Sequence, residues 1–285
     1  MGIMCAPFEY DERMTLFPES TGQEYSLSPC GSAVHVAAEV SRLGIESYLI
    51  GKIGTDSMGV QIQAGLAHTD IKPRLILSPA HHTNIAVFYV KQHGYIRTAV
   101  GTANQSLTAS EILDTARDLL PSLRYLYLGS CLKLDSLLPH IAMIVAEMRR
   151  QGIILICDPG HVPHTASQQQ LEMVRILAGQ SDYYLHNKDD FTFLWDSLTV
   201  EEAIVKVRSV SDCSIVIKNA PYHCLGVKGL QTYRISQQIQ SQHFAFYSDR
   251  FNAGFIHALD ANRHFRDCMR AGLESTRSEH RNPPL

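Results

Sequence analysis

The chain has 285 residues, with 25 Lys and Arg against 28 Asp and Glu, which gives a formal net charge of −3 at pH 7. This balance provides no general attraction to nucleic-acid phosphates or anionic lipid, so neither nucleic acid nor a membrane surface is an expected partner. No apolar run approaches the roughly 18 residues that span a bilayer, and the scattered cysteines form no C-x-x-C pair, so we expect a cytoplasmic protein without a zinc or redox motif.

The first third of the chain mixes helix-like and strand-like patterns. Ser32 precedes apolar residues at helical spacing, and Gly44 ends that helix. In the segment 73–100 the apolar residues alternate with polar ones, which predicts short strands with one solvated face. The other predicted elements here are a strand over 48–50 and a helix over 57–66.

From residue 108 onward, predicted helices and strands alternate. The strands are apolar throughout, which is typical of a parallel sheet covered on both faces. Helices are predicted over 110–119, 134–149, 171–178, 200–207, 251–259 and 265–273, and strands over 125–128, 153–157, 183–185 and 214–217. We therefore predict one α/β domain over 1–285. The alternating strands of 73–100, together with about 14–30, are expected to form a small β lid.

Two glycine-containing segments open predicted helices. In the first, 29–37, Gly31 and small residues let a ligand approach the free N–H groups at a helix start, although an ordinary capped start has the same composition. The second, 51–59, has neither the lysine of a phosphate-binding P-loop nor the G-x-G-x-x-G fingerprint of a dinucleotide site. A glycine-eased turn capped by Asp56 explains it equally well.

Two carboxylate-bearing segments complete the candidate site. Asn187-Lys188-Asp189-Asp190 follows the strand at 183–185, where carboxylates suit a Mg²⁺ ion held partly through water; a capped, solvated helix start is the alternative. Asp249 precedes the last apolar helix pattern. There it could accept the proton of an attacking hydroxyl, or it could serve as an ordinary N-cap.

Taken in order, these segments resemble the ribokinase-like (PfkB) family of sugar and nucleoside kinases, over about residues 17–275. The family's Gly-Gly helix start is matched with Cys30 in place of a glycine and His35 in place of an asparagine, and 51–59 fits its G-x-[IV]-G-x-D-x-x-G. The segments 101–108, 157–160 and 187–190 resemble its G-A-N-x-x-L-T, D-P-N and N-x-x-E motifs, and 218–220 falls where T-x-G or K-x-G sits beside ATP.

The last family motif, D-T-T-G-A-G-D-x-F-x-A-G-F, allows two alignments. One places Asp249 at the first aspartate, which leaves Phe255 at the position of the catalytic base. The other places Asp249 at the base itself, and we prefer it because it keeps more identities and the helix register. In this alignment Phe246-Tyr247-Ser248 replaces the glycine loop, whose N–H groups stabilise the transferring phosphoryl group.

The resemblance implies a three-layer α/β/α fold and phosphorylation of a sugar hydroxyl by ATP with Mg²⁺, at a rate lowered by the missing glycines. It makes Asp249 the catalytic base. It also implies a homodimer that pairs through the lid strands. The implied substrate-binding residues are Gly31, His35 and Asn104; the implied nucleotide-binding residues are Asn187, Asp190, Lys218 and Ala220, with Asp190 near Mg²⁺ through water.

Other hypotheses stay open. The missing glycines favour an inactive relative that binds a sugar or nucleotide, and a nucleoside could replace the sugar as substrate. The family's first strand, which ends in a substrate-binding aspartate, is expected to be short or missing; only Glu9 or Asp11 could replace that aspartate, and a truncated kinase would explain this. A nicotinamide oxidoreductase is disfavoured because G-x-G-x-x-G is absent.

Overall fold

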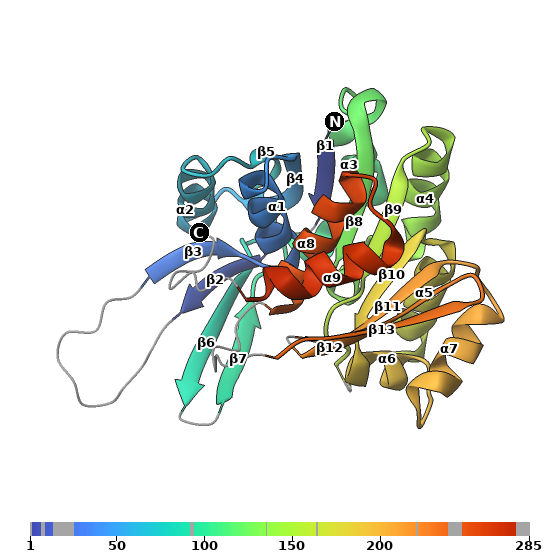
Figure 1. Cartoon of the computed structure of the whole chain (residues 1–285). Coiled ribbons are helices and arrows are strands. Elements are labelled where there is room, and N and C mark those ends of the chain that lie inside the picture. Colours follow the sequence, from blue (N-terminus) through green and yellow to red (C-terminus); the bar gives the residue numbers. More distant parts are fainter. Residues whose placement is uncertain are drawn as a thin grey trace.

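The computed structural model describes residues 2–6, 9–13, 26–91, 94–134, 136–163, 165–220, 222–238 and 247–277. Within these ranges the chain forms two sheets, and helices pack on both faces of the larger one (Figure 1). In this part of the chain no helix is both long and apolar enough to cross a membrane. The architecture is the three-layer α/β/α fold that was expected.

The larger sheet has nine strands in the described ranges, in the order β13-β12-β11-β10-β9-β8-β1-β4-β5. Neighbouring strands from β11 to β5 pair in parallel, and β12 and β13 add an antiparallel hairpin at one edge. The strands are β1 (Gly2–Ala6), β4 (Glu46–Gly54), β5 (Lys72–Ser78), β8 (Leu123–Gly129), β9 (Ile154–Asp158), β10 (Tyr183–Asn187), β11 (Ser214–Asn219), β12 (His223–Lys228) and β13 (Gln231–Ser236).

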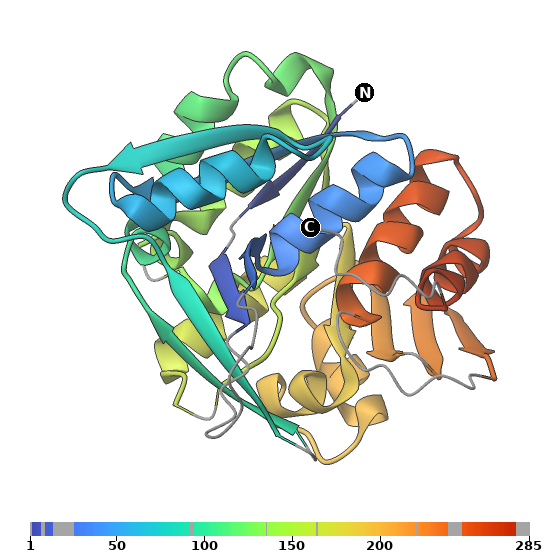
Figure 2. The ribbon, with the colours of Figure 1, turned by 90° about the vertical axis from the view of Figure 1, so that its left-hand side faces the viewer.

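Each face of this sheet has its own apolar cluster. Figure 2 shows α1 beside α8, and α9 packs against α8; these three helices together with α2 cover one face. The bounds of these helices are α1 (Ser32–Arg42), α2 (Ser57–Leu66), α8 (Tyr247–Asp260) and α9 (Phe265–Ser275). The other face is covered by α3 (Ala109–Ala116), α4 (Ile141–Arg150), α5 (Gln168–Gln180), α6 (Lys188–Leu194) and α7 (Val200–Arg208). Burial on both faces explains why the central strands are apolar throughout.

The smaller sheet has the order β3-β2-β6-β7, formed by β2 (Glu9–Arg13), β3 (Ser26–Cys30), β6 (Ile85–Lys91) and β7 (Gly94–Val100). One part of the predicted lid is wrong: β5 pairs in parallel with β4 and lies at the edge of the central sheet. An edge strand is partly solvated, so apolar and polar residues alternate in it as they do in the strands of a β lid. Residues 14–25, also expected in the lid, lie outside the described residues.

Further elements complete the comparison with expectation. The first strand is short but not missing, because β1 lies in the sheet between β8 and β4. Glu9 and Asp11 belong to β2 of the smaller sheet. The helix predicted over 134–149 begins only at Ile141, since Pro139 lies in a separate 3-10 turn, Leu138–His140, and proline is compatible with the start of a helix but not its interior. The β12–β13 hairpin was not predicted.

Helices α8 and α9 pack too closely for a methyl group at Gly254. A Cβ there would lie 2.0 Å from Ser275 Oγ and 2.7 Å from the Ala271 carbonyl oxygen. We predict that Gly254→Ala lowers the free energy of unfolding by about 1–3 kcal/mol, because overpacking outweighs the better helix propensity of alanine.

Chemical denaturation measures this effect, with Gly179→Ala as the matched control. A Cβ at Gly179, in α5, would meet its nearest described atom at 3.8 Å, an ordinary contact distance. The control should therefore be neutral or slightly stabilising. Equal stability of the two variants would contradict the close packing of α8 on α9.

Candidate active site

The candidate site lies at the carboxyl edge of the central sheet, where the strand order reverses. After β1 the chain builds β4 and β5 on one side, and β8 then begins the other half of the sheet. In open α/β sheets, ligand crevices form outside the carboxyl ends of the strands at such a point. Gly129, Asp158 and Asn187 end β8, β9 and β10 at this edge.

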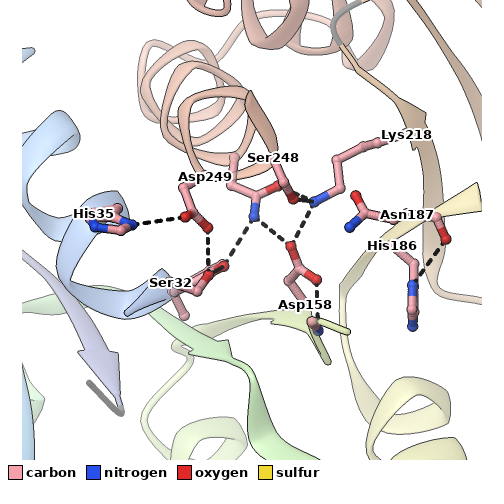
Figure 3. Close-up of polar contacts among 11 residues, drawn as sticks. Ser32, His35, Asp158, His186, Asn187, Lys218, Ser248 and Asp249 are labelled. Atoms are coloured by element: carbon pink, nitrogen blue, oxygen red, sulfur yellow. Dashed lines mark hydrogen bonds and ion pairs between the residues drawn. The ribbon is translucent and has the colours of Figure 1, made fainter. Parts of the chain in front are cut away.

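Helix α1 begins here with a conformation that is essentially restricted to glycine. Gly31 is its N-cap, with φ 115° and ψ 154°. Ser32 and His35 follow three residues apart, so their side chains lie on one side of the helix. Ser32 Oγ donates to Asp249 Oδ1 at 2.7 Å, and His35 Nδ1 lies 3.0 Å from Asp249 Oδ2 (Figure 3). Both carboxylate oxygens of Asp249 are thus held by α1.

Asp249 lies in the first turn of α8, where the helix dipole favours a carboxylate. Its side chain is 14% exposed, so it is shielded from bulk water without being sealed off. The helix begins at Tyr247, which means that Tyr247 and Ser248 of the replaced glycine segment are helical. Phe246 lies outside the described residues.

A fully buried lysine lies beside this helix start. The side chain of Lys218, on β11, is 0% exposed, and its Nζ lies 2.6 Å from Asp158 Oδ2. The same Nζ donates to Ser248 Oγ at 2.7 Å and to Asn252 Oδ1 at 2.9 Å. All three donors of the ammonium are therefore used within the protein, two of them on α8.

The partner of this lysine, Asp158, is held as a carboxylate. Burial alone would raise the pKa of Asp158, but the Lys218 ammonium and the hydrogen bond from Asn252 bring that pKa below its ordinary value. The Gly160 N–H donates to Oδ1 at 3.0 Å, and Asn252 Nδ2 donates to Oδ2 at 2.6 Å. The sequence had marked Asp158 only as part of a strand-end motif.

Asn187 and Asp190 flank the start of α6. Asn187 is the N-cap, and Asp190 Oδ1 accepts the Val162 N–H at 2.9 Å and lies 2.9 Å from His161 Nδ1. These contacts tie the segment after β9 to α6. Among the described residues, no group of three or more His, Cys, Asp or Glu side chains is placed to hold a metal ion. A magnesium ion at this edge would therefore rely on water and substrate phosphates for most of its ligands, as this ion commonly does.

The remaining predicted residues are Asn104 and Ala220. Asn104 is buried; its Oδ1 accepts the Lys52 N–H at 3.3 Å and its own N–H donates to Asn84 Oδ1 at 2.8 Å. These bonds tie the segment after β7 to β4 and to the residue that precedes β6. Ala220 directly follows β11 and is partly exposed.

Three residues at the centre of the site were not predicted: Ser32, Tyr127 and Asn252. Asn252 is fully buried in an otherwise apolar stretch of α8, which was a usable signal because buried amides need partners. Tyr127 lies in an apolar strand and carried no such signal. Figure 3 shows the side chains from His35 to Lys218 joined in one hydrogen-bonded row.

A fourth missed residue, His186, is buried behind the site against Tyr184 and Phe191. Its Nδ1 lies 3.1 Å from the Asn187 carbonyl oxygen, and its Nε2 has no hydrogen-bond partner among the described residues. Burial lowers the pKa of His186 to about 4, although the nearby Asp158 and Asp190 carboxylates act in the opposite direction.

Comparison with known proteins gives a consistent family. The pfkB family carbohydrate kinases match residues 2–276. A 96-residue segment, 32% of this chain, is 30% identical to the "Bifunctional protein HldE" of Bradyrhizobium sp. (strain ORS 278) and spans 20% of that protein.

Three solved structures illustrate the shared fold. The PfkB protein from Polaromonas sp. JS666 has a TM-score of 0.81 at 18% identity and covers 97% of this chain and 94% of that one. Fructokinase from Vibrio cholerae O395, bound to fructose, ADP and calcium, has a TM-score of 0.79 at 17% identity, with coverage of 97% and 91%. Adenosine kinase from Trypanosoma brucei brucei has a TM-score of 0.79 at 13% identity, with coverage of 96% and 97%.

His186 should make the fold sensitive to mild acid. Its pKa falls from 6.5 to about 4 in the folded protein, so the unfolded chain takes up a proton first as the pH decreases. We predict that stabilisation from the neutral ring is fully present above pH 6.5 and is lost as the pH falls to about 4, by at most about 1.4 kcal/mol per pH unit.

His186→Asn isolates this effect. Asparagine is neutral at every pH, and all the other histidines are the same in the wild type and the variant. Denaturation curves at pH 7 and pH 4.5 give the difference in unfolding free energy between wild type and variant. That difference should shift in favour of the variant at the lower pH. A difference that is independent of pH would contradict the lowered pKa of His186.

Proposed function

The chain belongs to the pfkB family of carbohydrate kinases, and from this premise we propose that it transfers the terminal phosphoryl group of ATP to a sugar hydroxyl. The observation that carries the proposal is the setting of Asp249, a partly shielded carboxylate in the first turn of α8 whose two oxygens are oriented by Ser32 and His35. A carboxylate held in this way can accept the proton of an attacking hydroxyl.

The proposal gives the neighbouring residues separate tasks. Gly31, His35 and Asn104 would face the sugar, with the N-terminus of α1 offering backbone N–H groups to its oxygens. Lys218 and Ala220 would lie near the nucleotide. Asn187 and Asp190 would hold Mg²⁺ through water, and that ion would supply charge neutralisation at the phosphates.

We expect turnover to be slow, because side chains replace the glycines that would let backbone N–H groups approach the developing charge. Ser248 replaces a glycine and Tyr247 replaces the alanine of the family's G-A-G; both are helical, and Ser248 Oγ is already bonded to Lys218. Removing one donor of this kind typically lowers the rate by about 10²–10³-fold. Nucleotide binding relies on contacts spread over a larger surface and should fall less.

A second candidate function is binding of a sugar or nucleotide without turnover. It is favoured by the contacts of Lys218, because all three donors of its ammonium bind protein groups and none is left for a phosphate. A nucleoside is a further candidate substrate. A panel of sugars and nucleosides, assayed for both binding and ADP formation, separates these possibilities.

The smaller sheet supports two subsidiary proposals. It ends in the strands β3 and β7, and open sheet edges favour pairing with another chain. We therefore propose that it covers the bound sugar and pairs with the same sheet of a second subunit. The cytoplasm, which supplies ATP, is the proposed compartment.

Asp249→Asn keeps the shape of the side chain and removes the base. We predict that ADP formation with the best substrate of the panel falls by about a hundredfold or more, while the rise in melting temperature caused by Mg·ATP is kept. Asp267→Asn is the matched control, since Asp267 is 40% exposed and pairs with Arg270 on the surface of α9. Unchanged activity in Asp249→Asn would exclude this residue as the base.

Restoring the glycine segment should raise the rate. We predict that Phe246→Gly/Tyr247→Ala/Ser248→Gly increases kcat by about tenfold or more, because the backbone N–H groups before Asp249 become accessible to the transferring phosphoryl group. Ser248→Ala is the control, since it breaks the contact with Lys218 without adding a glycine. Melting curves show whether each variant is folded. A wild-type rate already within about 1–100 per second would mean that other groups supply these donors.

A further inference from the structure

Tyr127 and Asn252 fill the space between the two carboxylates of the site. Tyr127 Oη lies 2.9 Å from Ser32 Oγ, which donates to Asp249. Asn252 Nδ2 donates to Tyr127 Oη at 3.0 Å and to Asp158 Oδ2 at 2.6 Å. Asn252 Oδ1 accepts from Lys218 Nζ at 2.9 Å. An unbroken series of hydrogen bonds therefore runs from Lys218 to Asp249.

The direction of every bond in this series is fixed. An ammonium can only donate, so Lys218 requires the amide oxygen of Asn252 to face it and leaves the amide N–H groups for Asp158 and Tyr127. At the other end, the Asp249 carboxylate accepts the Ser32 proton. Ser32 Oγ must then accept from Tyr127, whose hydroxyl is kept protonated because burial raises the pKa of Tyr127 well above 10.

The backbone of β8 is built to allow this approach. Gly129 ends the strand, and a Cβ at that position would lie 2.8 Å from Tyr127 Cε1 and 3.1 Å from both Ser32 Oγ and Tyr127 Oη. Any larger residue at 129 would push Tyr127 and Ser32 apart. Gly129 is thus needed at this position for the Tyr127–Ser32 bond.

We propose that Tyr127 and Asn252 are positioning residues for the base: they fix the Ser32 proton on Asp249 Oδ1 and so reserve Oδ2, the oxygen beside His35, for the proton of the attacking hydroxyl. The proposal rests on the kinase function above for its kinetic meaning. Bonds aligned in one direction polarise one another, which strengthens the last bond of the series, to Asp249.

A double-mutant cycle on kcat tests the proposal. Tyr127→Phe should lower kcat about tenfold, with KM little changed. A tenfold loss corresponds to the weakening of one hydrogen bond to a charged group, here the bond from Ser32 to Asp249. In a Ser32→Ala background the same change should have no further effect, whereas Ser32→Thr, which keeps a hydroxyl, should retain most of the activity. Additive losses in the double variant would overturn the proposal.

Tyr125→Phe is the matched control. Tyr125 lies two residues earlier on β8 in the same apolar cluster, and its buried hydroxyl has no hydrogen-bond partner among the described residues. This variant should leave kcat unchanged. Equal losses in Tyr125→Phe and Tyr127→Phe would show that both act through packing alone.

The hydrogen-bond series can also be detected without measuring activity. This measurement distinguishes an error in the series from an error in the proposed kinase function. A proton NMR spectrum should contain a slowly exchanging hydroxyl signal that disappears in Tyr127→Phe, moves in Ser32→Ala and Asn252→Ala, and stays in Tyr125→Phe. If this signal is present but no substrate turns over, the kinase function fails and the series stands. If the signal is absent, or does not move in Ser32→Ala, the series is overturned.

Discussion

Lys218 and Asp158 form an ion pair in the interior, with Nζ and Oδ2 2.6 Å apart and both side chains almost fully buried. Removing one partner of such a pair typically costs about 3–5 kcal/mol, because the other charge is left buried and unpaired. The pair joins the carboxyl-end regions of β9 and β11, and Lys218 also binds Ser248 and Asn252 of α8. The pair therefore helps to fix the position of α8, and with it that of Asp249.

If Asp249 is the base that we propose, the same pair explains how it can coexist with a weak phosphate site. The two charges neutralise each other inside the protein. The Lys218 ammonium also donates all its hydrogen bonds to protein groups, namely Asp158, Ser248 and Asn252. In the proposed reaction, such a site would orient Asp249 while Lys218 offers little positive charge to the transferring phosphoryl group. Rate depends on donors at the transition state, whereas affinity depends on many distributed contacts, so the two properties are expected to separate in this protein.

The sequence was sufficient for the general architecture, since apolar strands alternating with amphipathic helices predict a parallel sheet covered on both faces. The ordered motifs also predicted His35 and Asp249 in one site; the structure brings them within 3.0 Å, although they lie more than two hundred residues apart in the chain. Local patterns could not tell that β5 lies at the edge of the large sheet, because a half-solvated strand has the same alternation in either place. They also gave no sign of Tyr127, whose role depends on Ser32 and Asn252 reaching it from two other elements.

The central claim is that the Asp249 carboxylate, held at this edge of the sheet, serves phosphoryl transfer from ATP to a hydroxyl. Phosphorus NMR of the protein with Mg·ATP and each member of a sugar and nucleoside panel follows the fate of the terminal phosphate directly. The account predicts a phosphomonoester signal that grows slowly with at least one compound, accompanied by ADP, and that is missing from the Asp249→Asn variant. Inorganic phosphate as the sole product, or an ester formed equally well by the variant, would contradict it.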